Sequence, residues 1–258
     1  MALYTGHNVS PVHDLHYSWT GWPSACTLPQ CPDDSVFAAL AAAWRTDGLE
    51  LESREWTPAQ VHLTVRAGPD ASPVFVAARL KGRLQHALRL AGTPVAFSRK
   101  VSVRSLGHNV RATVEAYVRN QLRGVELADA RYTAALGRFS HRDDGVDLGE
   151  ASASASGRYW YNLHAVLVTA SRFRIGGDTF LAKVRDRTLE AAREAGCAIK
   201  ALAIMPDHLH VALRGAVEST PAKIAVLLQN GSTRAAGCRM WEDRFYVGTF
   251  SEYDMTAV

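Results

Sequence analysis

The sequence has little of what marks membrane, secreted or zinc-stabilised proteins. No run approaches the ~18 apolar residues that a membrane-spanning helix needs, and the segment "MALYTGHNVSPVHDLHY" lacks the charged start and apolar centre of a secretory signal. We therefore expect a cytoplasmic protein without a membrane partner. Cysteine is scarce, and no second pair joins the CxxxxC spacing to complete a zinc site, so we expect free thiols. The cysteines are Cys26, Cys31, Cys197 and Cys238.

The net charge of the chain is also small, but its positive charges are unevenly distributed. The formal net charge is +4, and arginine and lysine gather at 79–89, 98–105 and 172–177. Such clusters are compatible with a polyanionic partner, although a basic helix face is often only solvated. An aromatic RNP1-like strand motif is missing, which argues against an RNA-binding module.

Two parts of the chain repeat one pattern of elements on either side of a polar stretch. Residues 137–158 are polar and small, without apolar periodicity, and we expect them to form a linker between a first unit at 1–136 and a second at 159–258. Apolar periods predict the order β-α-β-β-α-β in each unit. The expected strands are 15–22, 49–56, 60–67, 101–105, 162–170, 198–205, 208–215 and 244–250, and the expected helices are 34–48, 72–92, 178–196 and 220–237.

This order is that of the ferredoxin-like, split βαβ unit. We therefore expect an α+β fold in which two such units form an intramolecular pseudo-dimer. The second helix of each unit should begin at the same kind of cap, Ser72 before a proline and Thr220 before a proline. A further helix is expected at 109–122 in the first unit, whereas the second unit stops before its counterpart.

The stretch "MPDHLHVALRG" places two histidines on one face of a predicted strand. His208 and His210 are two residues apart, so their backbones lie roughly 7 Å apart and both imidazoles can reach one divalent cation. The alternative is two polar side chains on a solvated strand face. When the two units are aligned, Gln60 and His62 stand where His208 and His210 stand.

Three ordered motifs together resemble a known family. The strand motif "MPDHLHVAL", a helix like "SPVFVAARLKGR" and the later helix motif "AYVRNQ" at 116–121 are similar to those of the single-tyrosine HUH transposases, the insertion-sequence-200-like enzymes and their REP-associated relatives. The resemblance implies a transposase or nickase that cuts and transfers single-stranded, hairpin-bearing DNA.

The same resemblance implies a division of roles. Tyr117 would be the nucleophile that forms a 5′-phosphotyrosine, and His208, His210 and Gln121 would hold a divalent metal, Mg²⁺ or Mn²⁺. Chemistry agrees, because a phenol with a pKa of about 10 is a weak nucleophile at neutral pH and a cation can assist it. Basic residues near the site should contact DNA phosphates. They are Arg79, Lys81, Arg83, Arg104 and Arg214.

The sequence departs from the family pattern in a complementary way. The first unit has the tyrosine helix but carries Gln60 in place of a histidine, and the second has both histidines but no tyrosine helix. We therefore expect one composite site, with His208 and His210 from the second unit and Tyr117 from the first.

Three questions stay open at this point. Gln60, His62 and Gln121 could bind metal weakly beside Tyr117 in a site of the first unit alone. The chain could instead be a domesticated or inactive protein that only binds single-stranded or hairpin DNA. Because excision needs two cleavages, a chain with one site would either form a homodimer or perform a smaller task such as nicking.

Overall fold

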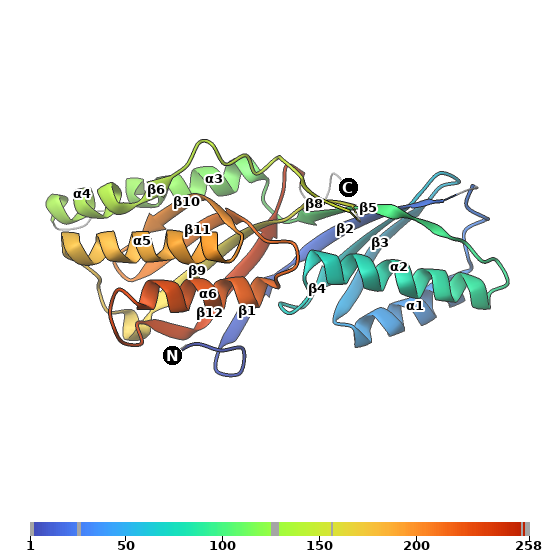
Figure 1. Cartoon of the computed structure of the whole chain (residues 1–258), viewed down its shortest axis with the longest axis horizontal. Helices are drawn as coiled ribbons and strands as arrows, with labels where there is room; N and C mark the ends of the chain where they lie inside the picture. The colour runs from blue at the N-terminus through green and yellow to red at the C-terminus, as the bar shows by residue number, and fades with distance from the viewer. Residues whose placement is uncertain (1–2, 25–26, 125–128, 156, 254, 256–258) are drawn as a thin grey trace.

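The structure is a computed structural model that describes residues 3–24, 27–124, 129–155, 157–253 and 255. Over these residues the fold is α+β, with two six-stranded sheets and six α-helices. The molecule is elongated, with one sheet and its helices at each end (Figure 1). None of the described helices is long and apolar enough to cross a membrane. Cys31, Cys197 and Cys238 are free thiols, and Cys26 lies outside the described residues.

The first sheet belongs mostly to the first unit and has the order β3-β4-β2-β5-β8-β7. Its strands and the two helices that pack on it are β2 (His16–Pro23), α1 (Asp34–Thr46), β3 (Leu49–Trp56), β4 (Val61–Ala67), α2 (Pro73–Leu90), β5 (Phe97–Leu106), β7 (Ser152–Ser154) and β8 (Gly157–Trp160).

The second sheet has the order β1-β12-β9-β11-β10-β6. Its strands are β1 (Ser10–Asp14), β6 (His141–Arg142), β9 (Asn162–Thr169), β10 (Ala198–Ile204), β11 (His208–Arg214) and β12 (Trp241–Phe250). The helices at this end of the molecule are α3 (Arg111–Asn120), α4 (Ala130–Phe139), α5 (Asp178–Glu194) and α6 (Pro221–Thr233), with short 3₁₀ turns at 121–124 and 170–172.

The four central strands follow the same order in both sheets. The first strand of each unit, β2 or β9, lies between the fourth strand and the third, and the second strand lies outside the third. The helix starts are also alike, because Ser72 Oγ accepts a hydrogen bond from the Phe75 amide and Thr220 Oγ1 accepts one from the Lys223 amide, both at 3.2 Å. The predicted caps are therefore confirmed.

Each sheet is extended by a strand that leads into the other sheet. β1 pairs in parallel with β12, and one residue later the chain continues as β2 in the first sheet; β8 pairs in parallel with β5 before the chain continues as β9. The segment expected as a plain linker, 137–158, carries β6, β7 and the start of β8. The reason is that sheet edges offer unpaired backbone groups that short extended segments can satisfy.

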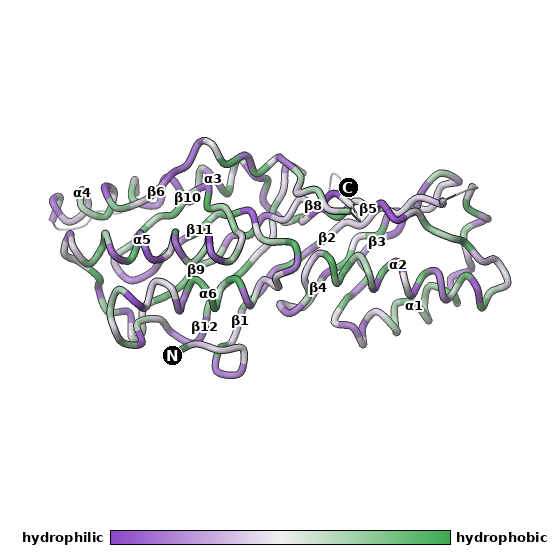
Figure 2. The backbone as a smooth tube through the Cα atoms, in the orientation of Figure 1, coloured by the Kyte–Doolittle hydropathy of each residue, from purple (hydrophilic) through white to green (hydrophobic). Residues whose placement is uncertain are grey.

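The two faces of the second sheet are covered differently. On β11, Leu209, Val211 and Leu213 belong to the large core that includes residues of α5 and α6. The alternate residue Ala212 packs on the opposite face in a small cluster with Val114 and Val118 of α3. Hydrophobic and hydrophilic residues accordingly alternate along the helices of this end (Figure 2). A helix of the first unit therefore lies on the sheet of the second.

Candidate active site

Helix α3 carries Tyr117 to the histidine face of the second sheet. Val114 is 8% exposed and Val118 is fully buried, so they fix the helix on the sheet. Tyr117, one residue before Val118, stays 52% exposed. Its ring lies edge-on to His210, with centroids 5.4 Å apart, and edge-on to His164 at 5.9 Å. Tyr117 thus contacts the second unit with its ring while its surface remains open to a large substrate.

His208 and His210 lie together on β11, as alternation along a strand requires. Their ring centroids are 4.9 Å apart. Leu209 between them is fully buried on the other face, which fixes the strand's orientation. His210 itself is only 5% exposed. The two imidazoles that the sequence singled out therefore share one small, partly enclosed site.

A third histidine, His164, completes this cluster and was missed by the sequence reasoning. It lies on β9, the strand that pairs with β11, and its Nε2 is 3.1 Å from His210 Nδ1. The two rings are nearly parallel, with centroids 5.4 Å apart. The signal in the sequence was a histidine within the apolar strand "NLHAVLVTA", but only the register of β9 against β11 shows that it meets His210.

His208 and His210 each have one ring nitrogen held by a neighbouring side chain and the other available. Asp207 Oδ1 lies 2.6 Å from His208 Nδ1, and Arg172 holds the same carboxylate at 3.1 Å. His210 Nδ1 is held by His164. Neither His208 Nε2 nor His210 Nε2 has a hydrogen-bond partner in the described part of the chain. A carboxylate on Nδ1 with a free Nε2 is the arrangement typical of metal-binding histidines.

The protonation states suit the same role. Burial lowers the pKa of His210 to about 3, aided by the neighbouring imidazoles, and burial lowers the pKa of His164 to about 4. Burial favours a raised pKa at Asp207, but hydrogen bonds from His208 and Arg172 outweigh it and hold the pKa below its usual range. At neutral pH the imidazoles of His164 and His210 are therefore neutral and the Asp207 carboxylate is charged, which suits a divalent cation. The side chains of this cluster therefore suit a bound divalent metal ion.

Gln121, the expected third ligand, has its side-chain amide hydrogen-bonded to its own helix. It begins the 3₁₀ turn after α3, and its Nε2 donates to the Tyr117 carbonyl oxygen at 3.2 Å. To act as a ligand it would have to exchange this bond for a different side-chain conformation.

His62 lies on β4 of the first sheet and Gln60 directly precedes this strand, at the other end of the molecule from α3 (Figure 1). Gln60 Oε1 accepts a hydrogen bond from Trp22 Nε1 at 3.2 Å, and His62 Nδ1 is 2.9 Å from Thr20 Oγ1. Burial lowers the pKa of His62. The structure therefore brings Tyr117 to His210 and not to His62.

The five basic residues lie in two regions. Arg79, Lys81 and Arg83 are on α2, in the other lobe from α3, where Asp47 holds both arginines and the Ser98 carbonyl accepts from Lys81. Arg104 lies on β5 with its guanidinium 4.1 Å from the centre of the Trp160 ring. Arg214 ends β11, on the same strand as the histidines, and binds Glu150 at 3.0 Å. Their contact with DNA stays a prediction.

The second part of the chain is similar to a known protein family. Residues 158–258 match the family model described as "Transposase IS200 like". These residues include His164, His208 and His210, whereas Tyr117 precedes them. No curated protein matches the sequence.

Among solved structures, the ligand-free regulatory subunit of aspartate kinase from Thermus thermophilus is similar at 13% identity. The similarity covers 84% of this chain and 93% of that chain, with a TM-score of 0.21. An overlap this loose supports no inference about fold or function.

The family match and the histidine cluster concern the same strands. The match points to transposase-type processing of DNA, and it lies on the part of the chain, residues 158–258, that carries the histidine cluster.

Proposed function

We propose that this chain is a metal-dependent endonuclease and strand transferase for single-stranded DNA that works through one composite site. The observation that carries the proposal is the ring contact between Tyr117 and His210, 5.4 Å between centroids, made across two parts of the chain. His208 and His210 would bind the metal through their free Nε2 atoms, with Gln121 as the third ligand after a change of side-chain conformation.

In the proposed reaction Tyr117 attacks a phosphodiester. A bond forms between its hydroxyl oxygen and phosphorus, the bond from phosphorus to the 3′ oxygen breaks, and the phenol proton is released while the departing 3′ oxygen gains a proton. The product is a 5′-phosphotyrosine and a free 3′ hydroxyl. A bound divalent ion would neutralise charge on the scissile phosphate. His164 positions His210 by their shared hydrogen bond, and Asp207 positions His208.

We further propose that the molecule is a ferredoxin-like pseudo-dimer that arose by duplication. The equal strand order of the two sheets supports this, and so does the reciprocal exchange of edge strands. Register supports it too: Thr20 lies opposite His62 on β4, as Val166 lies opposite His210 on β11. In this view His62 and His210 are equivalent positions, and the first unit has lost its metal site.

The proposed partner is single-stranded DNA that carries a hairpin, with Arg214 on the histidine strand β11 and Arg104 and the α2 residues as additional phosphate contacts. A homodimer would supply the second site that excision needs.

The second candidate function is DNA binding without chemistry. A pocket on the first sheet favours it, because Trp22 and Trp160 line it together with Lys100 and Arg158. Aromatic rings that accept bases and cations that accept phosphates are the chemistry of single-strand binding sites.

Incubation with Mn²⁺ and end-labelled single strands that contain hairpins separates the two functions. We expect a denaturation-resistant adduct on Tyr117, lost in Tyr117→Phe and kept in Tyr253→Phe, a matched control since Tyr253 is 47% exposed. Bound DNA without any adduct in the unaltered chain would contradict the enzyme and favour the binding protein.

A further inference from the structure

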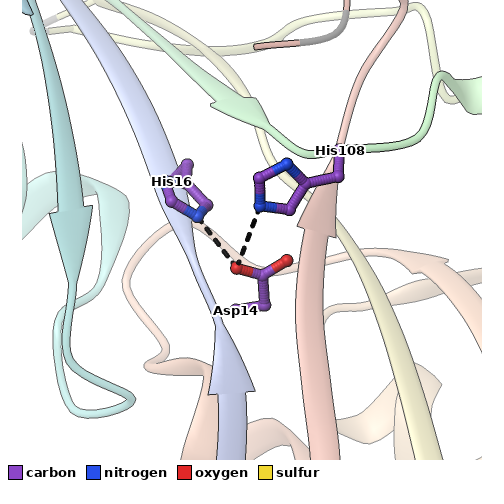
Figure 3. A group of neighbouring side chains, drawn as sticks. All are labelled: Asp14, His16 and His108. Atoms are coloured by element: carbon purple, nitrogen blue, oxygen red, sulfur yellow. Dashed lines mark hydrogen bonds and ion pairs between the residues drawn. The ribbon is translucent and has the colours of Figure 1, made fainter. Parts of the chain in front are cut away.

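A second cluster of metal-ligand side chains lies where the chain passes from one sheet to the other. Asp14 ends β1, His16 begins β2, and His108 follows β5 (Figure 3). Asp14 Oδ1 is 2.9 Å from His16 Nε2 and 3.8 Å from His108 Nε2. Over the described residues this is the group of three whose ligand atoms all lie within 4.8 Å of one another.

The hydrogen bonds of His16 are what point to a cation. Its Nδ1 lies 2.8 Å from Glu52 Oε2 and its Nε2 lies 2.9 Å from Asp14 Oδ1, and the residue is 4% exposed. A neutral imidazole has only one N–H to donate. With that hydrogen on Nδ1 toward Glu52, the lone pair of Nε2 faces the oxygen lone pairs of Asp14, and the repulsion is relieved either by a second ring proton or by a cation that both atoms bind.

Glu52 is placed for this role by an irregularity of the sheet. The pairing of β3 with β4 shifts between Leu51 and Ser53, so Glu52 is the extra residue of a β-bulge. Bulges redirect side chains, often beside functional sites. A carboxylate that holds the Nδ1–H of a histidine leaves Nε2 free and directed toward a metal.

His108 is brought close by a glycine. A Cβ on Gly107 would lie 2.1 Å from the Thr249 carbonyl oxygen, so only glycine lets the end of β5 approach β12 at this point. His108 then lies beside His16, with ring centroids 5.5 Å apart. Arg66 lies opposite His16 on β4 and forms its ion pair with Glu50, while its charge also acts on Glu52 and Asp14.

We propose that Asp14, His16 and His108 bind one divalent transition-metal ion, zinc being the best match, and that Glu52 orients His16. Two imidazoles and one carboxylate with an open fourth position are a common zinc ligand set. The ion would join β1 of the second sheet to β2 and β5 of the first. Its role would be to cross-link the two sheets.

This site is separate from the one beside Tyr117. Asp14 lies opposite Gly248, which lies opposite His164, so the two clusters are two strand spacings apart, or about 10 Å. Paired catalytic metals lie about 4 Å apart. The proposal therefore stands whether or not the enzyme function does.

The test uses the full chain with His208→Ala and His210→Ala, which removes the first site. After chelator treatment, titration with Zn²⁺ should give one ion per chain by calorimetry and a higher melting temperature, and Co²⁺ should give the visible absorption of a bound ion. His108→Ala should abolish these signals. Because His108 is exposed, this variant should fold even where His16→Ala does not.

His13→Ala is the matched control, since His13 is exposed on the alternate face of β1 and should leave binding unchanged. Glu52→Gln should weaken zinc about 10–100-fold. Absence of stoichiometric binding would overturn the proposal and leave His16 as a protonated link between two carboxylates. Binding that survives His108→Ala would overturn it as well.

Discussion

Among single residues, Asp207 has the most direct control over the proposed metal site. It holds His208 Nδ1 at 2.6 Å and is itself held by Arg172. Asp207→Asn removes the charge that orients His208. We expect Mn²⁺ affinity to fall about 10–100-fold, measured by calorimetry in a His108→Ala background so that only one site is observed.

The control is Asp178→Asn, which removes an exposed carboxylate that pairs with Arg138. Unchanged Mn²⁺ affinity in Asp207→Asn would show that His208 does not act as a carboxylate-oriented ligand.

Two buried tyrosines predict how stability depends on alkaline pH. Tyr17 and Tyr161 lie 6.3 Å apart between ring centroids, and burial raises the pKa of both phenols above the ordinary value of about 10. As pH rises, these phenols ionise in the unfolded chain at a lower pH than in the folded chain. The free energy of unfolding is therefore fully present below about pH 10 and falls as pH rises above it. Tyr17→Phe should reduce that loss by about 1 kcal/mol per pH unit.

Urea midpoints between pH 8 and 11 measure this effect. Tyr253→Phe, at an exposed phenol, should leave the slope as in the unaltered chain. Equal slopes for Tyr17→Phe and the unaltered chain would mean that the Tyr17 phenol ionises as easily in the folded state as in the unfolded one.

Single residues also show what sequence reasoning can and cannot predict. The pair His208 and His210 was visible because strand alternation is local. His164 was not, because its contact with His210 depends on which strand lies beside β11 and in which register. The Asp14 cluster was missed for the same reason: its members come together through strand crossing and a bulge.

At the scale of elements, the account depends on the docking of α3. Val118 is the fully buried anchor of this helix, so Val118→Asp should detach it, because an unpaired charge is costly to bury. A displacement of about 1 Å can cost 100-fold in rate, and we expect adduct formation to fall by about that factor while DNA is still bound.

The control is Arg119→Asp, which places the same aspartate at the exposed position next to Val118 and should preserve the adduct. Circular dichroism spectra establish that both variants fold. An undiminished adduct in folded Val118→Asp would show that α3 docking is not needed to place Tyr117.

Elements with strong local periodicity were predicted within a few residues of their bounds, including β3 at 49–56. β1 and β8 were not, because each is stabilised as a strand by pairing with a partner far along the chain. Helix α4 (Ala130–Phe139) was also missed, although Asp129 before it acts as its N-cap and accepts a hydrogen bond from the Arg131 amide. The division into units at 137–158 stays a prediction.

At the scale of the whole molecule, the exchange of strands explains why one chain can hold a composite site. Each unit contributes an edge to the other's sheet, and α3 crosses to lie on the second sheet near β10 and β11. The sequence predicted the two sets of elements but not their placement, because nothing local encodes how two sheets meet. That placement is what brings Tyr117 to His210 and leaves His62 at the other end.

The most direct test of the composite site compares one histidine from each of the two units. The covalent DNA adduct on Tyr117 is quantified by peptide mass spectrometry in His208→Ala and in His62→Ala, with Mn²⁺ and the same hairpin-bearing strand. The account predicts that His208→Ala abolishes the adduct, although it lies about 90 residues from Tyr117 in the chain, and that His62→Ala leaves most of it. Loss of the adduct in His62→Ala together with its survival in His208→Ala would contradict the composite site and place the chemistry in the first unit alone.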